Sequence, residues 1–417
     1  MKKFTADTIQ IGAYFGPFSK TKRYPDIPDA LNDASFRLAK DGGFNFLICY
    51  TQRYPETRDD VFRALDCAER AGMKMLLSDS HIEQGAIESK LMRQGKLPDM
   101  RRDYTSSVKD YGGHLAFLGC YIVDEPLPPK FPLLRDIRKV FDAVTPDKLF
   151  FVNMLPVYGI SAMENEFWIE EAERREEVYG RYISGYLETV KPPLLCYDYY
   201  PFQGDFPEFG VDYFVNLAVA RREAQKAGIP LWVSPQAAVQ GNMRALCEAE
   251  MRMQVNTSLA FGATGLIYFC WSMPCNGMCG KEVYSQALTD AGKPMPMYGF
   301  AKKVNLWVHK IEKFLLNGKN LGVLQAGTSP APIPVYAFAE TRGSLLDFSA
   351  KHALAGVFRI GGEFGYLIVN NSIDEEDEIR VSLSQKFLSY SADGEQEIGK
   401  SAVFRLAPGD AVFLKQI

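Results

Sequence analysis

The sequence predicts an α/β protein, a (β/α)8 TIM barrel followed by a C-terminal all-β sandwich domain. Its 417 residues exceed one ordinary domain and suffice for a barrel of about 250 residues or more with a smaller second module. Through residue 316, short apolar runs alternate with amphipathic stretches, as in repeated βα units. After about Leu321 the runs become short and alternating, which predicts antiparallel strands.

Eight apolar runs are predicted to be strands buried on both faces, because they are short, nearly continuous in apolarity and rich in β-branched or aromatic residues. They span residues 10–15, 44–50, 73–78, 115–123, 149–153, 194–198, 230–234 and 265–271. The helices between them include residues 29–40, 59–71, 132–144, 211–227 and 243–261, and the first two stop at glycines. Strict alternation of eight strands with helices favours a closed barrel over an open sheet.

The C-terminal segments AGVFRIGG, GYLIVNNS and EIRVSLS alternate with a period of two residues and are joined by turn residues. We therefore predict a barrel over residues 1–320 and a β-sandwich over residues 321–417. Its strands show neither clustered acids nor an aromatic platform. We expect the sandwich to pack on the barrel as a support and to lack catalytic residues.

Composition limits the partners that the chain can bind. The formal net charge of −4 offers no electrostatic footprint for nucleic acid or for an anionic membrane. The start MKKFTADT passes into a strand-like run without an apolar signal core, and the eight cysteines fit a reducing compartment. We expect a cytoplasmic protein as given, or a secreted or periplasmic one if a signal peptide was removed, with no nucleic-acid or membrane partner.

The sequence predicts no cofactor and no metal. No Gly-x-Gly-x-x-Gly follows a strand and no Gly-x-Ser-x-Gly elbow is present, and no phosphate-binding Gly-Lys-Ser/Thr loop is expected. Of the four histidines, only His81 follows a predicted strand, which disfavours a metal-dependent lyase or isomerase. Cys275 and Cys279 are expected to be structural or incidental.

Polar residues at strand ends are the candidates for a site, because a βα barrel builds its active site at the C-terminal ends of its strands. The strongest signal is Asp124-Glu125-Pro126, which closes the fourth run in GCYIVDEP. Two adjacent carboxylates must face a solvated pocket or be paired, since burying them bare is too costly. The like charge of Asp124 could raise the pKa of Glu125, as a general acid requires near neutral pH.

On these residues the sequence resembles the large clan of retaining glycoside hydrolases whose barrels carry Asn-Glu-Pro at the end of strand four. Glu125 falls on the general acid/base position of that clan, and Asp124 replaces the usual asparagine. The segments FGATGLIYFCW and ALTDAGKPMPMYG resemble the eighth unit of family 42 β-galactosidases, and PGDAVFL resembles the close of their C-terminal sandwich. The resemblance implies a glycoside hydrolase that acts on O-glycosyl bonds of an oligosaccharide or glycoside substrate.

The sequence departs from that clan at strand seven, where the clan places its nucleophilic glutamate. The segment IPLWVSPQAAVQGN contains no Asp or Glu, and Gln236 lies nearest the nucleophile position. An amide can bind a sugar hydroxyl but cannot form a glycosyl ester. The second carboxylate is predicted to be Asp198, which ends the sixth run in LLCYDYYPF, with Glu282 as a weaker candidate. A carboxyl separation of about 5–5.5 Å would imply retention, and about 6.5–9.5 Å would imply inversion.

Two alternatives stay open. LLCYDYYPF also resembles the Met-x-Tyr-Asp motif of family 18 chitinases, with Leu195 at the methionine position and Trp271 matching their strand-eight tryptophan. That likeness implies a substrate-assisted, hexosaminidase-like hydrolase, although the spaced aspartates of family 18 before the strand-four glutamate are absent here. The other alternative is a carbohydrate-binding pseudoenzyme, in which Gln236 marks the loss of the nucleophile.

Further strand-end residues are expected to bind substrate. They are Asp124, His81, Asn153, Tyr197, Tyr199, Gln236, Trp271 and Glu282. The two tyrosines flank Asp198, and the ring of Trp271 is predicted to form the pocket floor beside Glu125, because an aromatic face matches the apolar face of a pyranose. Trp168, Trp232 and Trp307 are expected to pack helices and the barrel exterior.

Overall fold

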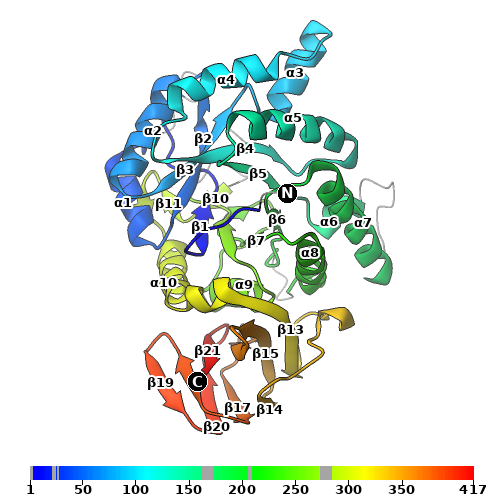
Figure 1. Ribbon diagram of the computed structural model, residues 1–417. Helices are drawn as coiled ribbons and strands as arrows, with labels where there is room; N and C mark the ends of the chain where they lie inside the picture. The colour runs from blue at the N-terminus through cyan, green and yellow to red at the C-terminus, as the bar shows by residue number, and fades with distance from the viewer. Residues whose placement is uncertain (1–2, 21–24, 26–27, 162–171, 205–208, 273–283) are drawn as a thin grey trace.

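Eight parallel strands form a nearly closed barrel in the computed structural model, which describes residues 3–20, 25, 28–161, 172–204, 209–272 and 284–417 (Figure 1). In sheet order they are β5 (Leu149–Asn153), β4 (Phe117–Asp124), β3 (Lys74–Asp79), β2 (Phe46–Tyr54), β1 (Gln10–Ala13), β9 (Gly265–Tyr268), β7 (Leu231–Ser234) and β6 (Leu195–Asp198). A parallel bridge between Met154 and Tyr197 joins the two edge strands, and the N–H of Met154 donates to the carbonyl of Cys196 at 2.9 Å. The predicted barrel is confirmed.

Helices ring the strands, as Figure 1 shows. They are α1 (Asp33–Asp41), α2 (Arg58–Arg70), α3 (Gln84–Gln94), α4 (Met100–Tyr111), α5 (Phe131–Val144), α6 (Val157–Ser161), α7 (Ala172–Val190), α8 (Tyr213–Ala227), α9 (Glu248–Ala260) and α10 (Pro296–Asn317). In α5, Leu134, Ile137 and Phe141 recur at helical spacing and are buried against the barrel. Helix α8 stops at Gly228, whose φ of +69° is the left-handed conformation that glycine adopts without strain.

The barrel interior is filled by aromatic side chains, and Trp232 is one of them. Its ring lies 5.8 Å from that of Phe46 and 6.3 Å from that of Phe151. The expectation that Trp232 packs on the barrel exterior is therefore wrong. Gly265 on β9 makes room for it, because a Cβ there would overlap the indole. Trp307 packs between helices as expected, and its indole N–H donates to Asn256 Oδ1 at 3.1 Å.

The C-terminal part of the chain forms antiparallel sheets, as predicted. One sheet has the order β13 (Gly318–Gly327), β15 (His352–Ile360), β16 (Glu363–Asn370), β21 (Ala411–Gln416), β18 (Phe387–Tyr390) and β19 (Glu395–Ile398); the other has the order β14 (Leu345–Ser349), β17 (Asp377–Leu383) and β20 (Ser401–Leu406). Alternate side chains of β17 are buried between the sheets, which explains the period of two residues in the sequence. The short strands β8 (Val239–Gln240), β10 (Tyr284–Gln286), β11 (Thr289–Asp290) and β12 (Lys293–Pro294) lie in the barrel loops.

The sandwich packs against α9 and α10. Gly356 lies so close to the backbone of Ala260 that a Cβ would overlap it. The Asn256 side chain donates to the carbonyl of Gly409 at 2.9 Å, and the rings of Phe314 and Phe413 stack with centroids 5.1 Å apart. These contacts hold the two parts of the chain together. Within the described residues, no helix has the length and apolarity needed to cross a membrane.

Candidate active site

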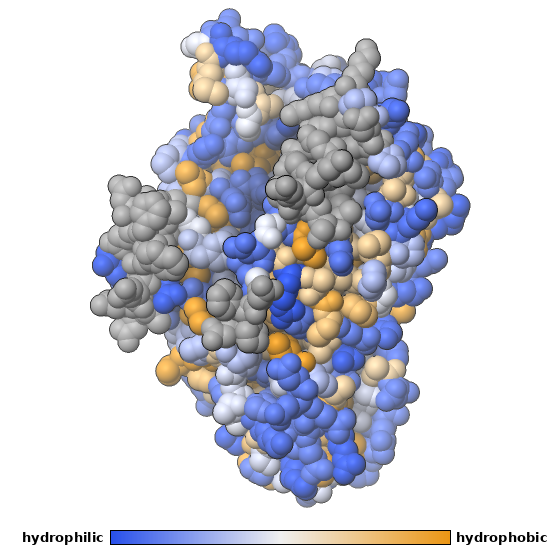
Figure 2. Space-filling view, turned by 180° about the vertical axis from the view of Figure 1, so that it is seen from behind, coloured by the Kyte–Doolittle hydropathy of each residue, from blue (hydrophilic) through white to orange (hydrophobic). Residues whose placement is uncertain are grey.

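A pocket of about 1430 Å³ opens at the C-terminal ends of the barrel strands. Asp124, Asn153 and Asp198 end β4, β5 and β6, while Tyr14 follows β1 and Phe269 follows β9. The face opposite that in Figure 1 is hollowed over the barrel, and hydrophilic and hydrophobic surfaces meet there (Figure 2). Every described residue that lines the pocket lies between positions 14 and 269, so the described part of the sandwich contributes none.

Glu125 lines the pocket and has an unusual backbone conformation. Its φ is +47°, in the left-handed region that side chains other than glycine rarely adopt. Its N–H donates to the carbonyl of Asn153 at 2.9 Å, which ties this turn to the neighbouring strand β5. Strained backbone of this kind persists only where the surroundings enforce it, and it is frequent at functional sites.

Asp124 and Glu125 are electrostatically linked. The side chain of Asp124 is open to the pocket yet surrounded by protein, and it accepts a hydrogen bond from Asn153 Nδ2 at 3.0 Å. Desolvation raises the pKa of Asp124, while the bond from Asn153 lowers it. Desolvation and then the charge of Asp124 raise the pKa of Glu125 to about 7. Glu125 therefore keeps its proton into the neutral range.

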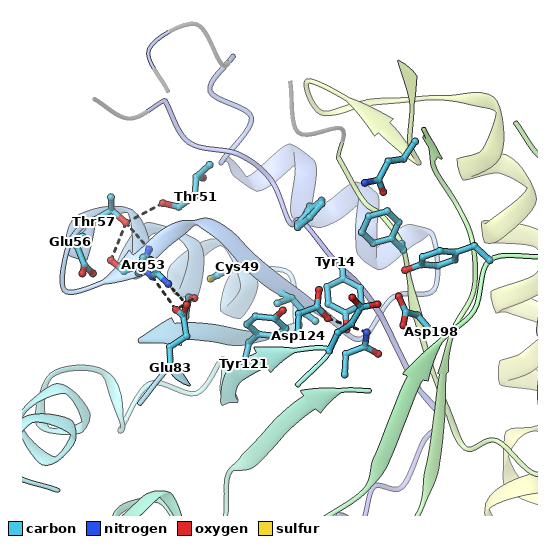
Figure 3. A pocket seen from close by; sticks show the side chains of 18 of the residues that line it. Tyr14, Cys49, Thr51, Arg53, Glu56, Thr57, Glu83, Tyr121, Asp124 and Asp198 are labelled. Carbon is cyan, nitrogen blue, oxygen red and sulfur yellow. Dashed lines mark hydrogen bonds and ion pairs between the residues drawn. The ribbon is translucent and has the colours of Figure 1, made fainter. Parts of the chain in front are cut away.

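Asp198 is the third carboxyl group of the pocket and lies to the side of Asp124 in Figure 3. The residue is 6% exposed, and its Oδ1 has no hydrogen-bond partner among the described residues. Desolvation, followed by the charges of Glu125 and Asp124, raises the pKa of Asp198 well above its ordinary value, while hydrogen bonding by Tyr200 and Asn153 opposes that shift. The ionisation of each carboxyl thus depends on the other two.

Aromatic rings surround the three carboxyls. The described ones are Tyr14, Phe15, Tyr121, Tyr158, Tyr200 and Phe269. The ring of Tyr200 lies 5.2 Å from that of Phe269, and Tyr14 lies 6.1 Å from the same ring. The hydroxyl of Tyr14 is buried and has no hydrogen-bond partner among the described residues. Apolar rings beside hydrogen-bonding groups are the surface that a pyranose requires.

One edge of the pocket is charged, and sequence reasoning missed it. Strand β2 continues to Tyr54, past the predicted end at residue 50, and so carries Arg53 to the pocket. Arg53 pairs with Glu83, and its Nε lies 3.0 Å from Glu83 Oε2 (Figure 3). Arg58 pairs with Asp110 at 2.9 Å. Both arginines are therefore neutralised by carboxylates of the chain itself.

The prediction that Trp271 forms the pocket floor is wrong. Its ring is fully buried outside the pocket, 5.5 Å from the ring of Phe44 and 6.2 Å from that of Tyr298. Strand β9 ends at Tyr268, so the alternation that points Ile267 into the barrel interior does not extend as far as Trp271. Phe269, two residues further on, takes the pocket position that the sequence suggested for tryptophan.

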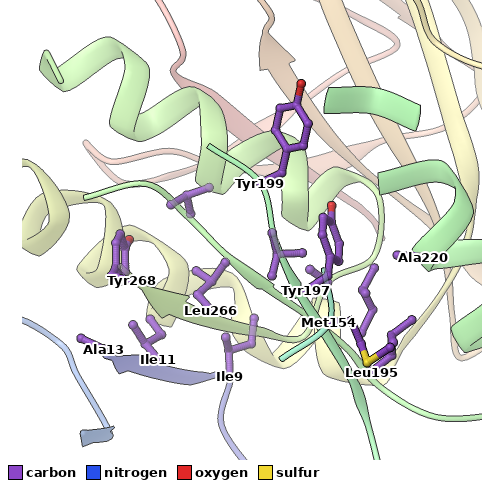
Figure 4. Close-up of a cluster of buried hydrophobic side chains, with 14 of the residues drawn as sticks. Ile9, Ile11, Ala13, Met154, Leu195, Tyr197, Tyr199, Ala220, Leu266 and Tyr268 are labelled. Atoms are coloured by element: carbon purple, nitrogen blue, oxygen red, sulfur yellow. The ribbon is translucent and has the colours of Figure 1, made fainter. Parts of the chain in front are cut away.

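Tyr197 and Tyr199 also do not line the pocket. Both belong to the cluster of buried side chains in Figure 4, with Leu195 and Leu266. The ring of Tyr199 lies 5.9 Å from that of Tyr213 on α8. The reason is again alternation along β6, which places Asp198 in the pocket and its tyrosine neighbours against the helix layer.

Gln236 is fully buried and does not line the pocket, so the expectation that it binds substrate is not supported by its placement. Its Oε1 accepts from the N–H of Phe202 at 3.1 Å, and its Nε2 donates to the carbonyls of Phe202 and Arg244 at 3.0 and 3.2 Å. The amide thus joins two loops of the barrel through their backbones.

We predict that Gln236→Ala lowers the free energy of unfolding, because it leaves buried backbone groups of Phe202 without partners, at a cost of about 1–3 kcal/mol. Urea unfolding measures this as a lower midpoint with an unchanged slope. The matched control is Gln396→Ala, at an exposed position, which is expected to change stability by less than about 0.5 kcal/mol. Equal stability of the two variants would contradict the structural role of Gln236.

The remaining predicted site residues do not all lie in the pocket. Asn153 lines the pocket, whereas His81 does not, and His81 Nδ1 instead contacts Ser107 Oγ at 2.9 Å and Asp79 Oδ1 at 3.3 Å. Glu282, Cys275, Cys279 and Trp168 lie outside the described residues. The described part of the chain brings together no group of three or more His, Cys, Asp or Glu side chains suited to a metal ion.

Residues 394–401 match the letters of a phosphate-binding loop, GEQEIGKS, at a place where no such loop was expected. That loop requires a strand, a glycine-rich turn and then a helix whose N-terminus receives the phosphate. Here the segment runs through β19 into β20, and no helix follows it. The match carries no nucleotide-binding geometry.

Comparison with solved structures finds glycoside hydrolases with a similar fold. No protein-family model matches the chain, and no curated protein sequence matches it. A family 39 glycoside hydrolase from the gut symbiont Bacteroides cellulosilyticus WH2 has a similar structure, with a TM-score of 0.56 and 13% identity over 98% of this chain and 81% of that one. A glycoside hydrolase family 5 protein from Bacteroides vulgatus ATCC 8482 gives a TM-score of 0.55 and 12% identity, covering 98% of this chain and 89% of that one. At these identities the likeness shows a shared fold.

Proposed function

We propose that the chain is a glycoside hydrolase that cleaves O-glycosyl bonds in this pocket, with Glu125 as its general acid. The observation that carries the proposal is the pair Asp124 and Glu125 at the end of β4, where burial and the neighbouring charge raise the pKa of Glu125 to about 7. A carboxylic acid that stays protonated at neutral pH can give its proton to the departing glycosidic oxygen. The fold shared with glycoside hydrolases supports the same reaction.

Asp198 is the proposed second carboxyl. It lies in the same pocket as Glu125, and the charges of the two groups affect each other. While Glu125 holds its proton, Asp198 loses a neighbouring negative charge and ionises more readily. An ionised Asp198 would act across the sugar from Glu125, either as the nucleophile or as the base that activates water.

The charges of the pocket favour an uncharged sugar. Arg53 and Arg58 are each paired with a carboxylate, so neither offers a free cation to an acidic substrate. The other charged side chains of the described lining are all acidic: Glu56, Asp59, Asp60, Glu83, Asp124, Glu125 and Asp198. A sugar carboxylate or sulfate would meet like charge, whereas a neutral pyranose could stack on rings such as Phe269.

The experiment that tests the proposal is a panel of 4-nitrophenyl glycosides offered to the purified chain. We expect turnover of at least one neutral glycoside and none of the matching uronides. Turnover confined to 2-acetamido sugars would assign the substrate-assisted form of the reaction. Turnover of a uronide in preference to its neutral counterpart would contradict the proposed charge selection.

A carbohydrate-binding pseudoenzyme is the second candidate, and one observation favours it. The pocket residues contributed by the loop after β7 are Gln240, Gly241, Asn242 and Met243, none of which is a carboxylate. This candidate predicts sugar binding without turnover across the whole panel, and binding that survives Glu125→Gln. Calorimetric titration with the same sugars distinguishes the two candidates.

The pKa of Glu125 predicts the pH dependence of hydrolysis. The acid is active when protonated, so kcat/KM is expected to fall as pH rises through about 7 and to drop about tenfold for each further unit. A pH–rate profile from about pH 5 to 9 measures this. A profile that stays flat above neutral pH would exclude Glu125 as the acid in the free enzyme.

A further inference from the structure

A second pocket, of about 590 Å³, lies at the opposite end of the barrel from the active-site pocket. We call it the floor pocket. Gln10 and Leu231, which begin β1 and β7, line it together with the last turns of α8 and α10 and the start of β13. It therefore lies where the N-terminal ends of the barrel strands meet the sandwich. Its volume falls within the range of small-molecule sites, about 300–1000 Å³.

A buried arginine faces this pocket, and no acidic side chain of the described residues pairs with it. Arg221 on α8 is 9% exposed and lines the floor pocket. Its Nε donates to Asn320 Oδ1 at 2.5 Å and its Nη2 lies 3.5 Å from the carbonyl of Asn320, both neutral groups. A guanidinium carries five N–H donors, so three remain without a partner among the described residues.

The burial of this charge is not compensated by the protein. Desolvation lowers the pKa of Arg221 to about 10, and among the described residues no carboxylate raises it. Taking a charged group out of water without an opposite charge is costly, and buried charges in proteins are usually paired. An anion that entered the pocket would supply the missing partner.

The other charged residues of the floor pocket are, like Arg221, mostly positive. Among the described lining residues, Lys3, Lys313 and Lys319 stand against one carboxylate, that of Asp7. Helix C-termini favour cations, but that effect is confined to the last turn. Arg221 lies more than one turn before the end of α8 at Ala227, so the helix end does not account for it.

We propose that the floor pocket binds a phosphate group, either as free phosphate or as the phosphate of a small sugar phosphate. The planar guanidinium of Arg221 would hold two phosphate oxygens through its free donors, and the lysines at the rim would balance the second negative charge. Because the site joins α8, α10 and β13, its ligand would bridge the barrel and the sandwich. The proposal does not depend on the reaction in the other pocket.

Thermal unfolding and calorimetric titration of the full chain test this, with sodium phosphate, glucose 6-phosphate and glucose as probes at constant ionic strength. Binding to the native state raises the melting temperature. We expect a saturable rise of at least about 2 °C with one of the two phosphates and none with glucose. A tenfold tighter affinity for glucose 6-phosphate would identify a sugar phosphate as the ligand, and equal affinities would identify free phosphate.

Variants locate the site. Arg221→Gln is expected to weaken phosphate affinity at least tenfold, whereas Arg101→Gln, at an exposed position of α4, should leave it unchanged. If Arg221→Gln does not fold, the double variant Lys313→Gln with Lys319→Gln is expected to weaken affinity several-fold, with the exposed Lys386→Gln as its control. Absence of a saturable response in the wild type, or an undiminished response in the variants that fold, would overturn the proposal.

Discussion

Replacing Glu125 by glutamine is expected to lower kcat/KM for a phenyl glycoside by at least about 100-fold, the low end of what a positioned acid contributes. Glutamine keeps the size of the side chain and its ability to donate a hydrogen bond, but it has no proton to transfer at any accessible pH. Because the backbone of residue 125 is anchored by the bond from its N–H to Asn153, the variant should keep the same turn. Steady-state kinetics at pH 6 to 7 give the loss directly.

The control for this variant is Glu397→Gln, which removes a carboxylate from the sandwich surface where it pairs with Lys386. It should retain full activity and a similar melting temperature. Hydrolysis by the wild type that is untouched by Glu125→Gln would exclude both the proposed mechanism and the pseudoenzyme. Glu282, the weaker candidate from the sequence, would then become the carboxyl to examine.

The second large effect is expected at Asp198. Asp198→Asn should lower kcat/KM for the same glycoside by at least about 100-fold, because an amide can act neither as nucleophile nor as base. Unlike most losses of activity, this one should come without a loss of stability. The carboxyl is buried, one of its oxygens has no hydrogen-bond partner in the described part of the chain, and it lies among two other carboxyls whose charges disfavour its ionisation.

Thermal unfolding at about pH 8, where carboxyls with raised pKa values destabilise the native state, distinguishes a loss of activity from a loss of stability. We expect the melting temperature of Asp198→Asn to equal or exceed that of the wild type. Asp393→Asn, in an exposed turn of the sandwich, serves as the matched control for both measurements. A variant that loses stability in proportion to its activity would assign Asp198 a structural role.

The barrel could be predicted from the sequence because each buried strand is recognisable from its own run of apolar residues. Apolar runs of buried parallel strands are nearly continuous, so β5 (Leu149–Asn153) was predicted with its observed bounds, and the carboxyls at the ends of β4 and β6 follow from the same pattern. Strand β2 was predicted too short because its second half, TQRY, is polar. That half leaves the core and reaches the pocket edge, which apolarity does not reveal.

Some site predictions were wrong because the direction of a side chain depends on where its strand ends. Trp271 and Phe269 are both aromatic residues near the end of one strand, and only the position of the strand end decides which one faces the pocket. Gln236 was misplaced for a different reason: its partners, Phe202 and Arg244, come from other loops. The neutral environment of Arg221 is equally non-local, since Asn320 lies 99 positions away in the chain.

The most direct test of the central claim, that Glu125 protonates the departing oxygen, compares leaving groups. A phenyl glycoside needs this proton, whereas a 2,4-dinitrophenyl glycoside departs readily without it. We predict that Glu125→Gln loses at least about 100-fold in kcat/KM on the phenyl glycoside and less than about tenfold on the dinitrophenyl glycoside. An equal loss on both substrates would show that Glu125 positions the sugar or supports the fold, and would contradict its role as the acid.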